Sequence, residues 1–383
     1  MAPSPAEDKT ETMAPNQSIS RVALLQATTN DDGAYSSDRL ADQLHRGVLL
    51  RLRRGVYVAA ESWLMAPRWR RYELAAAAEA LVGGPPLFCR ETALRLHGLP
   101  VLNLSSAIKV RTVGRGRVTT LPEVSMTGQV STAEFLGRYA VSHGAQRRAS
   151  AEAKLRNVRK KYLEPALPAG VSRPELRSAA ARNRYTNPEV HLPADALSGI
   201  AGPRAGYRAE PAGLAVVDTV SRLPFPDAVV VLDAVKARAD IDVEPWLGYL
   251  RTQRQRRQWE RAWHFADPRA ESALESESRA VLHELGIPAP TLQRVVRTRI
   301  GTFRLDMCWE DERVVGEIDG RSKYFDQQFT GGQDAHQIHY AEKQRREAVE
   351  EDGWQVVRWG KEQVRHPEQL IRRLGRHGVR PRW

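Results

Sequence analysis

The sequence predicts a multidomain protein of mixed class, in which α/β and α+β parts follow one another along the chain. Three observations support this prediction. The length of 383 residues exceeds that of one small domain and favours two or three. Near the N-terminus a helical pattern precedes two short alternating apolar runs. Near the C-terminus helical patterns flank two strand-like segments that carry acidic residues.

We expect five segments along the chain. In order they are a disordered tail at 1–17, a helix-and-hairpin domain at 18–66, a mixed α/β middle region at 67–245, a basic linker helix at 246–265 and an α/β domain at 266–383. The tail is rich in Pro, Ser and charge, which is typical of disorder. Order should begin near Ser18, with a short helix through Val22, Leu24 and Leu25.

The composition narrows the possible partners. Lys and Arg exceed Asp and Glu by 58 − 46 = 12, and such an excess favours polyanions, although surplus arginine can also simply solvate a surface. The two cysteines, Cys89 and Cys308, lie far apart, which argues against a disulfide framework or a zinc site and fits a cytoplasmic setting. The apolar run Ala228–Leu232 is too short for a bilayer, and the N-terminus resembles neither signal nor anchor. We therefore expect DNA as a partner and no membrane association.

The first structured domain should present a basic helix. Ser36 or Ser37 is a suitable N-cap, and Gly47 ends the pattern after Arg46. Leu40 and Leu44 fall on the inner face. The outer face carries three polar residues at helical spacing, which are Arg39, Gln43 and Arg46.

Two apolar-alternating runs then flank a basic tip and predict a hairpin. The tip is Arg53-Arg54-Gly55. A helix followed by such a hairpin is the plan of a winged helix-turn-helix, whose helix enters the major groove and whose wing meets phosphates. We therefore expect Arg39, Gln43, Arg46, Arg53 and Arg54 to contact DNA. The alternative is a small structural domain with a solvated charged helix.

Two short motifs here resemble the N-terminal winged helix of AbiEi-type antitoxins. The first is Gly47 followed by Arg51–Tyr57 (RLRRGVY), and the second is Arg90–Pro100 (RETALRLHGLP). The resemblance implies a DNA-binding antitoxin or repressor with a possible toxin partner. The lone His97 within the second motif is expected to be a packed or capping residue rather than a ligand.

The middle region mixes helical and extended patterns. We expect a helix at Tyr72–Val82, a strand at Ile108–Thr112 and a charged helical run at Gln146–Lys161. The last run carries basic side chains that either track a phosphate backbone or are merely solvated, namely Arg148, Arg159, Lys160 and Lys161. A second basic helix, Arg251–Trp263, leads into the C-terminal domain.

The C-terminal domain should open with a helix that Gly286 and Pro288 end. Leu274, Val281 and Leu285 form its apolar stripe. Glu277 lies on that stripe and needs a partner, either in a metal shell or a basic residue, unless it sits at a partly exposed edge.

Two acid-bearing strands follow at Thr302–Trp309 and Val314–Asp319. Along the first strand we expect the side chains of Phe303, Leu305, Met307 and Trp309 to share one face, and those of Arg304, Asp306 and Cys308 to share the other.

A two-residue turn at Asp311-Glu312 would pair residues whose numbers sum to 623 and place Asp306 directly opposite Glu317. A bulge at Gly316 would break this register. Two such carboxylates suit Mg²⁺ (or Mn²⁺), which takes one or two carboxylates and keeps waters and a phosphate oxygen.

Basic residues near these acids complete the expected chemistry. Lys323 follows the second strand, and Lys343 and Arg346 share a face with His339 on a helix predicted from about Asp334 to Glu351. Metal-assisted phosphodiester hydrolysis needs such a cation to stabilise the transition state. The alternative is a hairpin whose acids Arg304 and Arg346 neutralise without metal.

A set of motifs in this region resembles the Vsr-like endonuclease-fold family of the PD-(D/E)XK superfamily. They are Glu277-Ser278-Arg279, Gly286-Ile287-Pro288, Arg304-Leu305-Asp306, Glu317-Ile318-Asp319-Gly320, Lys323-Tyr324, Glu342-Lys343, Arg345-Arg346-Glu347, Gly353-Trp354 and Val357-Arg358.

The resemblance implies a restriction-endonuclease-like α/β fold. It also implies Asp306 and Glu317 as metal ligands, Asp319 as a third acid, and Lys343 and Arg346 as basic partners. Asp319 stands where the family pattern has a lysine, a role that Lys323 or Lys343 would have to take over.

We therefore expect a cytoplasmic DNA-binding protein with a Mg²⁺-dependent endonuclease-like domain. The first alternative is a non-enzymatic antitoxin-type repressor that uses a degenerate nuclease fold to bind DNA. The second is a protein that binds a toxin, with basic regions of no functional role.

Overall fold

The computed structural model describes residues 22–27, 37–82, 86–105, 107–111, 131, 133–137, 151–152, 154–156, 158–163, 200–201, 208–318 and 335–382. The predicted tail, Arg148, Asp319 and Lys323 lie outside these residues. Within them the protein is mixed α/β, with three four-stranded sheets and helices packed around them.

The N-terminal sheet has the order β2-β3-β1-β7. The short helix expected through Val22, Leu24 and Leu25 is wrong: Val22–Gln26 is strand β1, because its backbone pairs with β3 (Val56–Ala59) antiparallel and with β7 (Ile200–Ala201) parallel. Sheet partners distant in sequence decided the conformation of this short apolar run.

The predicted basic helix and hairpin are both present. Helix α1 spans Ser37–His45 and ends in a Schellman motif, in which Gly47 has φ 74° and Val48 N donates to Gln43 O. Strands β2 (Leu49–Arg53) and β3 then pair antiparallel around Arg54-Gly55. Glycine suits both turns, because Gly55 also has φ 74°.

The middle region continues with short helices and a second sheet. It contains α2 (Ala60–Met65), α3 (Arg68–Ala80), β4 (Leu87–Phe88), α4 (Arg90–Leu96), β5 (Ala107–Arg111), β6 (Arg159–Leu163) and β8 (Arg208–Ala209), with sheet order β6-β5-β4-β8. The predicted helix and strand near 72 and 108 are confirmed with shifted ends. The helix expected to reach Lys161 is wrong at its end, because β6 pairs parallel with β5.

Three helices and a 3-10 turn connect this region to the C-terminal sheet. They are α8 (Ala212–Val220), α9 (Phe225–Lys236), η2 (Glu244–Tyr249) and α10 (Gln253–Phe265). The predicted basic helix is α10, which Thr252 caps with a capping box. One contiguous apolar core runs from Leu24 to Ala280, so α8, α9 and α10 pack into the same core as the N-terminal elements. Among the described residues no helix is long and apolar enough to cross a membrane.

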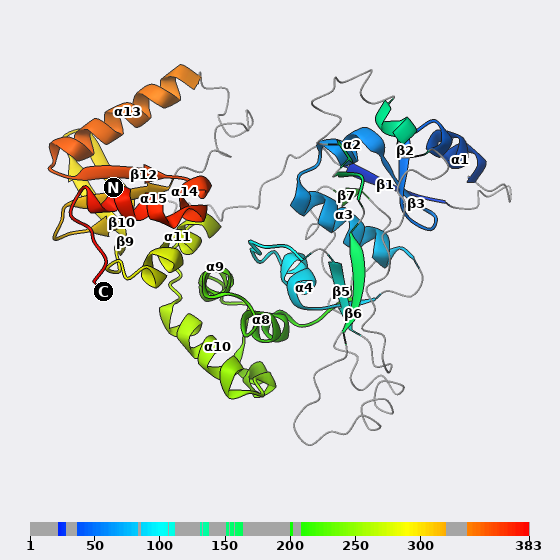
Figure 1. The fold of residues 1–383 in the computed structure, drawn as a ribbon, viewed down its shortest axis with the longest axis horizontal. Coiled ribbons are helices and arrows are strands. Elements are labelled where there is room, and N and C mark those ends of the chain that lie inside the picture. The colour runs from blue at the N-terminus through cyan, green and yellow to red at the C-terminus, as the bar shows by residue number, and fades with distance from the viewer. Residues whose placement is uncertain are drawn as a thin grey trace, which may run out of the picture.

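The C-terminal sheet has the order β12-β11-β10-β9 and lies between helices (Figure 1). Its elements are α11 (Ala273–Glu284), β9 (Thr291–Thr298), β10 (Gly301–Trp309), β11 (Val314–Ile318), α13 (Ala335–Glu351), β12 (Gln355–Trp359), α14 (Lys361–Arg365) and α15 (Pro367–Gly375). Helix α13 covers one face, and α11, α14 and α15 cover the other. Strands β9, β10 and β11 are antiparallel, and β12 runs parallel to β11.

The predicted register of β10 with β11 is confirmed. Met307 pairs with Gly316, Cys308 with Val315 and Trp309 with Val314, so every pair sums to 623. Arg313 N donates to Glu310 O across the two-residue turn. No bulge occurs at Gly316. A Cβ there would lie 2.2 Å from the ring of Trp359, so glycine is needed for ring packing.

The expected alternation along β10 is wrong at its centre. Leu305 packs in the α13-side cluster, whereas Met307 packs in the cluster on the opposite face, although two residues separate them. The reason lies in the neighbouring strand, where Gln293 has a positive φ of 55° and its register position faces Asp306. The strand pair therefore changes face at these two residues.

Candidate acidic site on the C-terminal sheet

Glu317 lies at the end of β11 on the face that α13 covers, and it is 6% exposed. Its Oε1 accepts from Arg345 of α13 at 2.5 Å. Its Oε2 accepts from Nε of Arg358 at 2.8 Å. Arg358 is also its direct neighbour in the parallel register with β12. A buried carboxylate requires such partners, and two guanidiniums meet this requirement here.

Asp306 directly precedes Met307, whose pair with Gly316 is the last between β10 and β11, and it lies where β10 changes face. It is partly exposed, and its Oδ2 accepts from the backbone N–H of Ile318 at 3.3 Å. The side chain therefore lies at the strand that carries Glu317.

Glu342 completes a charge-balanced cluster with Glu317, Arg345 and Arg358. Its carboxylate pairs with Arg358 and lies 3.3 Å from Nε of Arg345. Partial burial disfavours the charge of Arg358, but Glu317 and Glu342 outweigh this effect and hold the pKa of its guanidinium above the ordinary value. Arg358 is therefore a fixed cation at the site.

Lys343 and Arg346 do not reach this cluster. Both are exposed, and they pair along α13 with Glu347 and Glu350. Helical periodicity explains why Arg345, and neither Lys343 nor Arg346, faces the acids. Val349 packs inward, so the residue four positions earlier, Arg345, turns inward with it. Arg304, the other expected neutralising residue, pairs with Glu271.

Glu277 also lies away from Asp306 and Glu317. Burial raises the pKa of its carboxyl, and the nearest charges that act on it belong to Lys361, Asp227 and Arg365. These residues belong to α14 and α9, on the opposite side of the sheet from α13.

Asp306 and Glu317 provide the carboxylate oxygens that a hard cation such as Mg²⁺ prefers. Within the part of the chain that the structure describes, no group of three or more His, Cys, Asp or Glu side chains gathers as a metal site. The third expected acid, Asp319, and the expected lysine, Lys323, lie outside that part. The two acids present have oxygens of the kind that a cation prefers, and both oxygens of Glu317 accept hydrogen bonds from guanidiniums.

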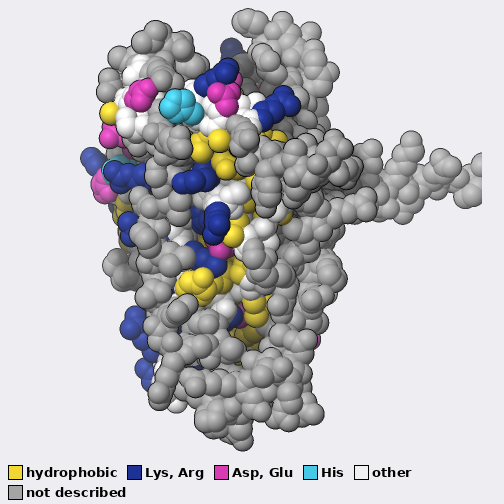
Figure 2. All heavy atoms as spheres, turned by 90° about the vertical axis from the view of Figure 1, so that its right-hand side faces the viewer, with side chains coloured by type: hydrophobic (Ala, Val, Ile, Leu, Met, Phe, Trp, Pro, Cys, Tyr) yellow, Lys and Arg dark blue, Asp and Glu magenta, His cyan; other side chains and the backbone are white. Residues whose placement is uncertain are grey.

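Of the five residues expected to contact DNA, four lie at the surface and one, Arg53, is buried. Arg39 and Arg54 are exposed, Gln43 is partly exposed, and the exposed Arg46 pairs with Asp42 at 2.9 Å. Figure 2 views this side of the molecule, where Lys and Arg side chains lie among hydrophobic and acidic ones on the described surface.

Arg53 differs from its neighbours at the hairpin tip. Only 8% exposed, it donates to Glu79 at 2.7 Å and to the carbonyls of Leu52 and Val158. The expectation that Arg53 contacts phosphate is therefore wrong for this conformation, because β2 directs its side chain into the protein rather than out of the wing.

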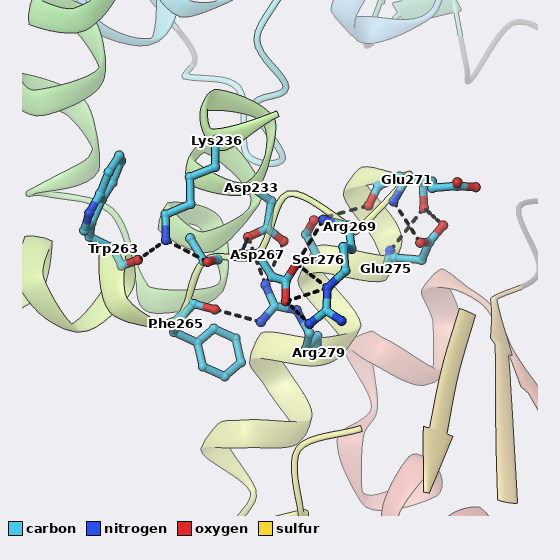
Figure 3. A network of polar contacts seen from close by, with 12 residues as sticks. Asp233, Lys236, Trp263, Phe265, Asp267, Arg269, Glu271, Glu275, Ser276 and Arg279 are labelled. Carbon is cyan, nitrogen blue, oxygen red and sulfur yellow. Dashed lines mark hydrogen bonds and ion pairs between the residues drawn. The ribbon is translucent and has the colours of Figure 1, made fainter. Parts of the chain in front are cut away.

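A buried ion pair that the sequence did not suggest joins α11 to α9. Arg279 donates to both carboxylate oxygens of Asp233 at 2.8 and 2.9 Å and to the carbonyl of Phe265 (Figure 3). The guanidinium carbon also lies 4.3 Å from the centroid of the Phe265 ring. Lys236 adds hydrogen bonds to the carbonyls of Trp263 and Ala266, so this network fixes α9, α10 and α11 together.

His97 is packed, as expected. Its Nε2 lies 2.6 Å from the carbonyl oxygen of Glu210, and burial lowers its pKa. The neutral ring with hydrogen on Nε2 therefore donates to that carbonyl. Arg111 of β5 pairs with two buried acids, Glu210 and Asp218. Burial also raises the pKa of the Cys89 thiol well above its ordinary value. These groups stabilise the second sheet.

Two known proteins are similar to part of the chain. They are uncharacterized protein MT2308 of Mycobacterium tuberculosis (strain CDC 1551 / Oshkosh) and uncharacterized protein Rv2248 of Mycobacterium tuberculosis (strain ATCC 25618 / H37Rv), each 34% identical over 120 residues. The matched part is 31% of this chain and 41% of each relative. No protein-family model matches the chain. No solved structure matches it either.

Proposed function

We propose that the chain is a DNA-binding protein whose C-terminal domain hydrolyses DNA phosphodiester bonds with a divalent metal ion, as a Vsr-like PD-(D/E)XK nuclease. The observation that supports this proposal is that Oδ2 of Asp306 accepts from the backbone N–H of Ile318, the residue after Glu317, so the two acids belong to adjacent strands. Two acids on adjacent strands, with cations beside them, are the arrangement that metal-assisted hydrolysis requires.

Asp306 and Glu317 would hold the cation, which polarises the phosphate and lowers the pKa of the attacking water. Arg345 and Arg358 replace Lys343 and Arg346 as the proposed cations, because their guanidiniums already lie against Glu317. Guanidiniums match phosphate oxygens in geometry, so these two would bind the phosphate and stabilise its developing charge. Lys323 and Asp319 keep their proposed roles.

The N-terminal helix and hairpin would supply DNA affinity as a winged helix. Arg39 and Gln43 lie on α1, Arg46 directly follows its last residue, and Arg54 lies at the exposed hairpin tip. Arg53 is left out of this proposal, because Glu79 and two carbonyls already hold it.

One experiment tests the enzymatic proposal. The full chain is incubated with supercoiled plasmid and Mg²⁺ or Mn²⁺, beside Asp306→Ala, Glu317→Ala and the control Asp311→Ala. Asp311 is an exposed acid in the turn of the same hairpin. We expect nicking by the wild type and the control alone. Equal nicking by all four proteins, or no nicking by any of them, would contradict the proposal.

A second candidate is a non-enzymatic antitoxin-type repressor, with a toxin as a possible partner. The observation that favours it is that both oxygens of Glu317 accept hydrogen bonds from guanidiniums. DNA binding without cleavage under any metal condition would support this candidate over the nuclease.

A further inference from the structure

A basic pocket lies at the outer edge of the C-terminal sheet, beside the acidic site. It encloses about 300 Å³ and is lined by Val356, Val357 and Arg358 of β12 and by Arg373, Arg376 and His377 of α15 and its end. Strand β12 is the edge strand of its sheet, so this side of the strand faces the pocket instead of another strand. We define these six residues as the edge pocket.

Two arginines of the edge pocket, Arg373 and Arg376, have no carboxylate partner among the described residues, whereas Arg345 and Arg346 both have one. The first two are exposed, and Nη1 of Arg373 donates to the carbonyl of Arg358 at 2.9 Å. This bond holds the Arg373 side chain against β12 and leaves its other N–H donors available.

Arg358 connects the edge pocket to the acidic site. The residue lines the pocket, its backbone carbonyl accepts from Arg373, and its guanidinium pairs with Glu317 and Glu342. An anion in the pocket would therefore lie next to β12 at Arg358, the residue whose guanidinium pairs with Glu317.

We propose that the edge pocket binds a phosphate group of a nucleic acid backbone, flanking the phosphate at Asp306 and Glu317. This inference rests on the proposed function and adds a substrate-positioning site to it. Arginines without a carboxylate partner in a concave site, such as Arg373 and Arg376, suit a phosphate. A guanidinium offers several donors to phosphate oxygens, and here no existing ion pair has to rearrange.

The test measures binding of a short fluorescent DNA duplex to the full chain by anisotropy, in EDTA so that no cleavage occurs. The variants are Arg376→Glu and the double variant Arg373→Ala/Arg376→Ala. The control is Arg372→Ala, which removes an equally exposed charge from the same helix but outside the pocket. Arg376→Glu changes an exposed side chain just after α15, so its fold should persist, and thermal melting checks this for each protein.

We expect both pocket variants to bind several-fold more weakly, with the slope of log affinity against log salt reduced by about 1 for each phosphate that is no longer bound. Arg372→Ala should bind as the wild type does. Normal binding by Arg376→Glu would overturn the proposal, and so would an equal weakening in Arg372→Ala, which would indicate diffuse charge.

A second arm separates free phosphate from DNA as the source of the anion. Inorganic phosphate is titrated against the bound duplex, with chloride at matched ionic strength. Stronger displacement by phosphate supports a phosphate site. If the wild type binds phosphate but the pocket variants bind DNA as tightly as the wild type does, the assignment of the pocket to nucleic acid is wrong.

The outcome is distinguishable from failure of the proposed function. If Arg376→Glu binds DNA normally while the wild type nicks plasmid, the edge pocket is wrong and the nuclease stands. If Arg376→Glu loses affinity while the wild type never nicks, the pocket stands and the nuclease is wrong.

Discussion

Arg279 of α11 holds Asp233 of α9 through two hydrogen bonds, and the two side chains are 7% and 1% exposed. This pair joins the helix that opens the C-terminal domain to a helix of the large N-terminal core. Removing one partner would leave the other charge buried and alone, which is costly in a low-dielectric interior.

We expect Arg279→Met to lower the free energy of unfolding by about 3 kcal/mol, as measured by urea denaturation. Arg269→Ala, at the more exposed pair with Asp267, should change it by less than about 1 kcal/mol. In the double variant Arg279→Met/Asp233→Leu much of the lost stability should return, because no unpaired charge remains. A single variant as stable as the wild type would show that the pair is not a fixed link.

Gly316 should tolerate no larger residue. A Cβ at this position would lie 2.2 and 2.7 Å from atoms of the Trp359 ring and 3.2 Å from the ring of Trp309. We expect Gly316→Ala to cost about 3 kcal/mol of stability, since buried rings cannot move aside without disrupting the core. Gly248→Ala is the control, because no atom lies within 4 Å of its added Cβ. Equal melting temperatures for both variants would contradict this packing.

His97 should make stability depend on pH. Burial lowers its pKa, so the unfolded chain, with an ordinary value near 6.5, binds a proton before the folded chain does. The free energy of unfolding should therefore fall as pH decreases below about 6.5, until the folded pKa is reached. His97→Gln, whose amide can donate to the same carbonyl, should show a shallower slope in urea titrations across this range. Parallel curves would show that His97 does not cause the slope.

The exposed Arg39 of α1 and Arg46, just after this helix, should bind phosphates. We expect Arg39→Ala/Arg46→Ala to weaken DNA binding and to reduce its salt slope by about 1 for each phosphate that is no longer bound. The measurement is fluorescence anisotropy over a range of salt concentrations. Unchanged affinity and slope would count against a winged helix that uses this face.

The strand pair that carries the acids could be predicted from the sequence because its determinants are local. A polar two-residue turn at Asp311-Glu312 suffices to define the register. Helix ends at Gly47 and Gly286 were predictable for the same reason, since each glycine takes the positive φ that ends the helix.

Features that depend on distant partners were not predictable from these patterns. Strands β9 and β12 were missed. Val22–Gln26 became a strand only by pairing with β3 and β7. The burial of Arg53 depends on Glu79, which lies 26 residues further along the chain in α3.

In the acidic site, the helical spacing of basic residues predicted the wrong side of α13. The helical spacing of Arg345 from Val349, which packs inward, was the signal that Arg345 faces the sheet. Strand alternation from Val356 was the signal that Arg358 lies on the same face of β12. A pair such as Asp233 and Arg279, which lie 46 residues apart, leaves no such signal.

The most direct test of the central claim, that Asp306 and Glu317 form one cation site, is calorimetric titration of Mn²⁺ into the metal-free full chain. We predict saturable binding that Asp306→Asn and Glu317→Gln each abolish and that the turn variant Asp311→Asn retains, with folding of all four proteins checked by melting. Equal binding by Asp306→Asn and the wild type, or no saturable binding by the wild type, would contradict it.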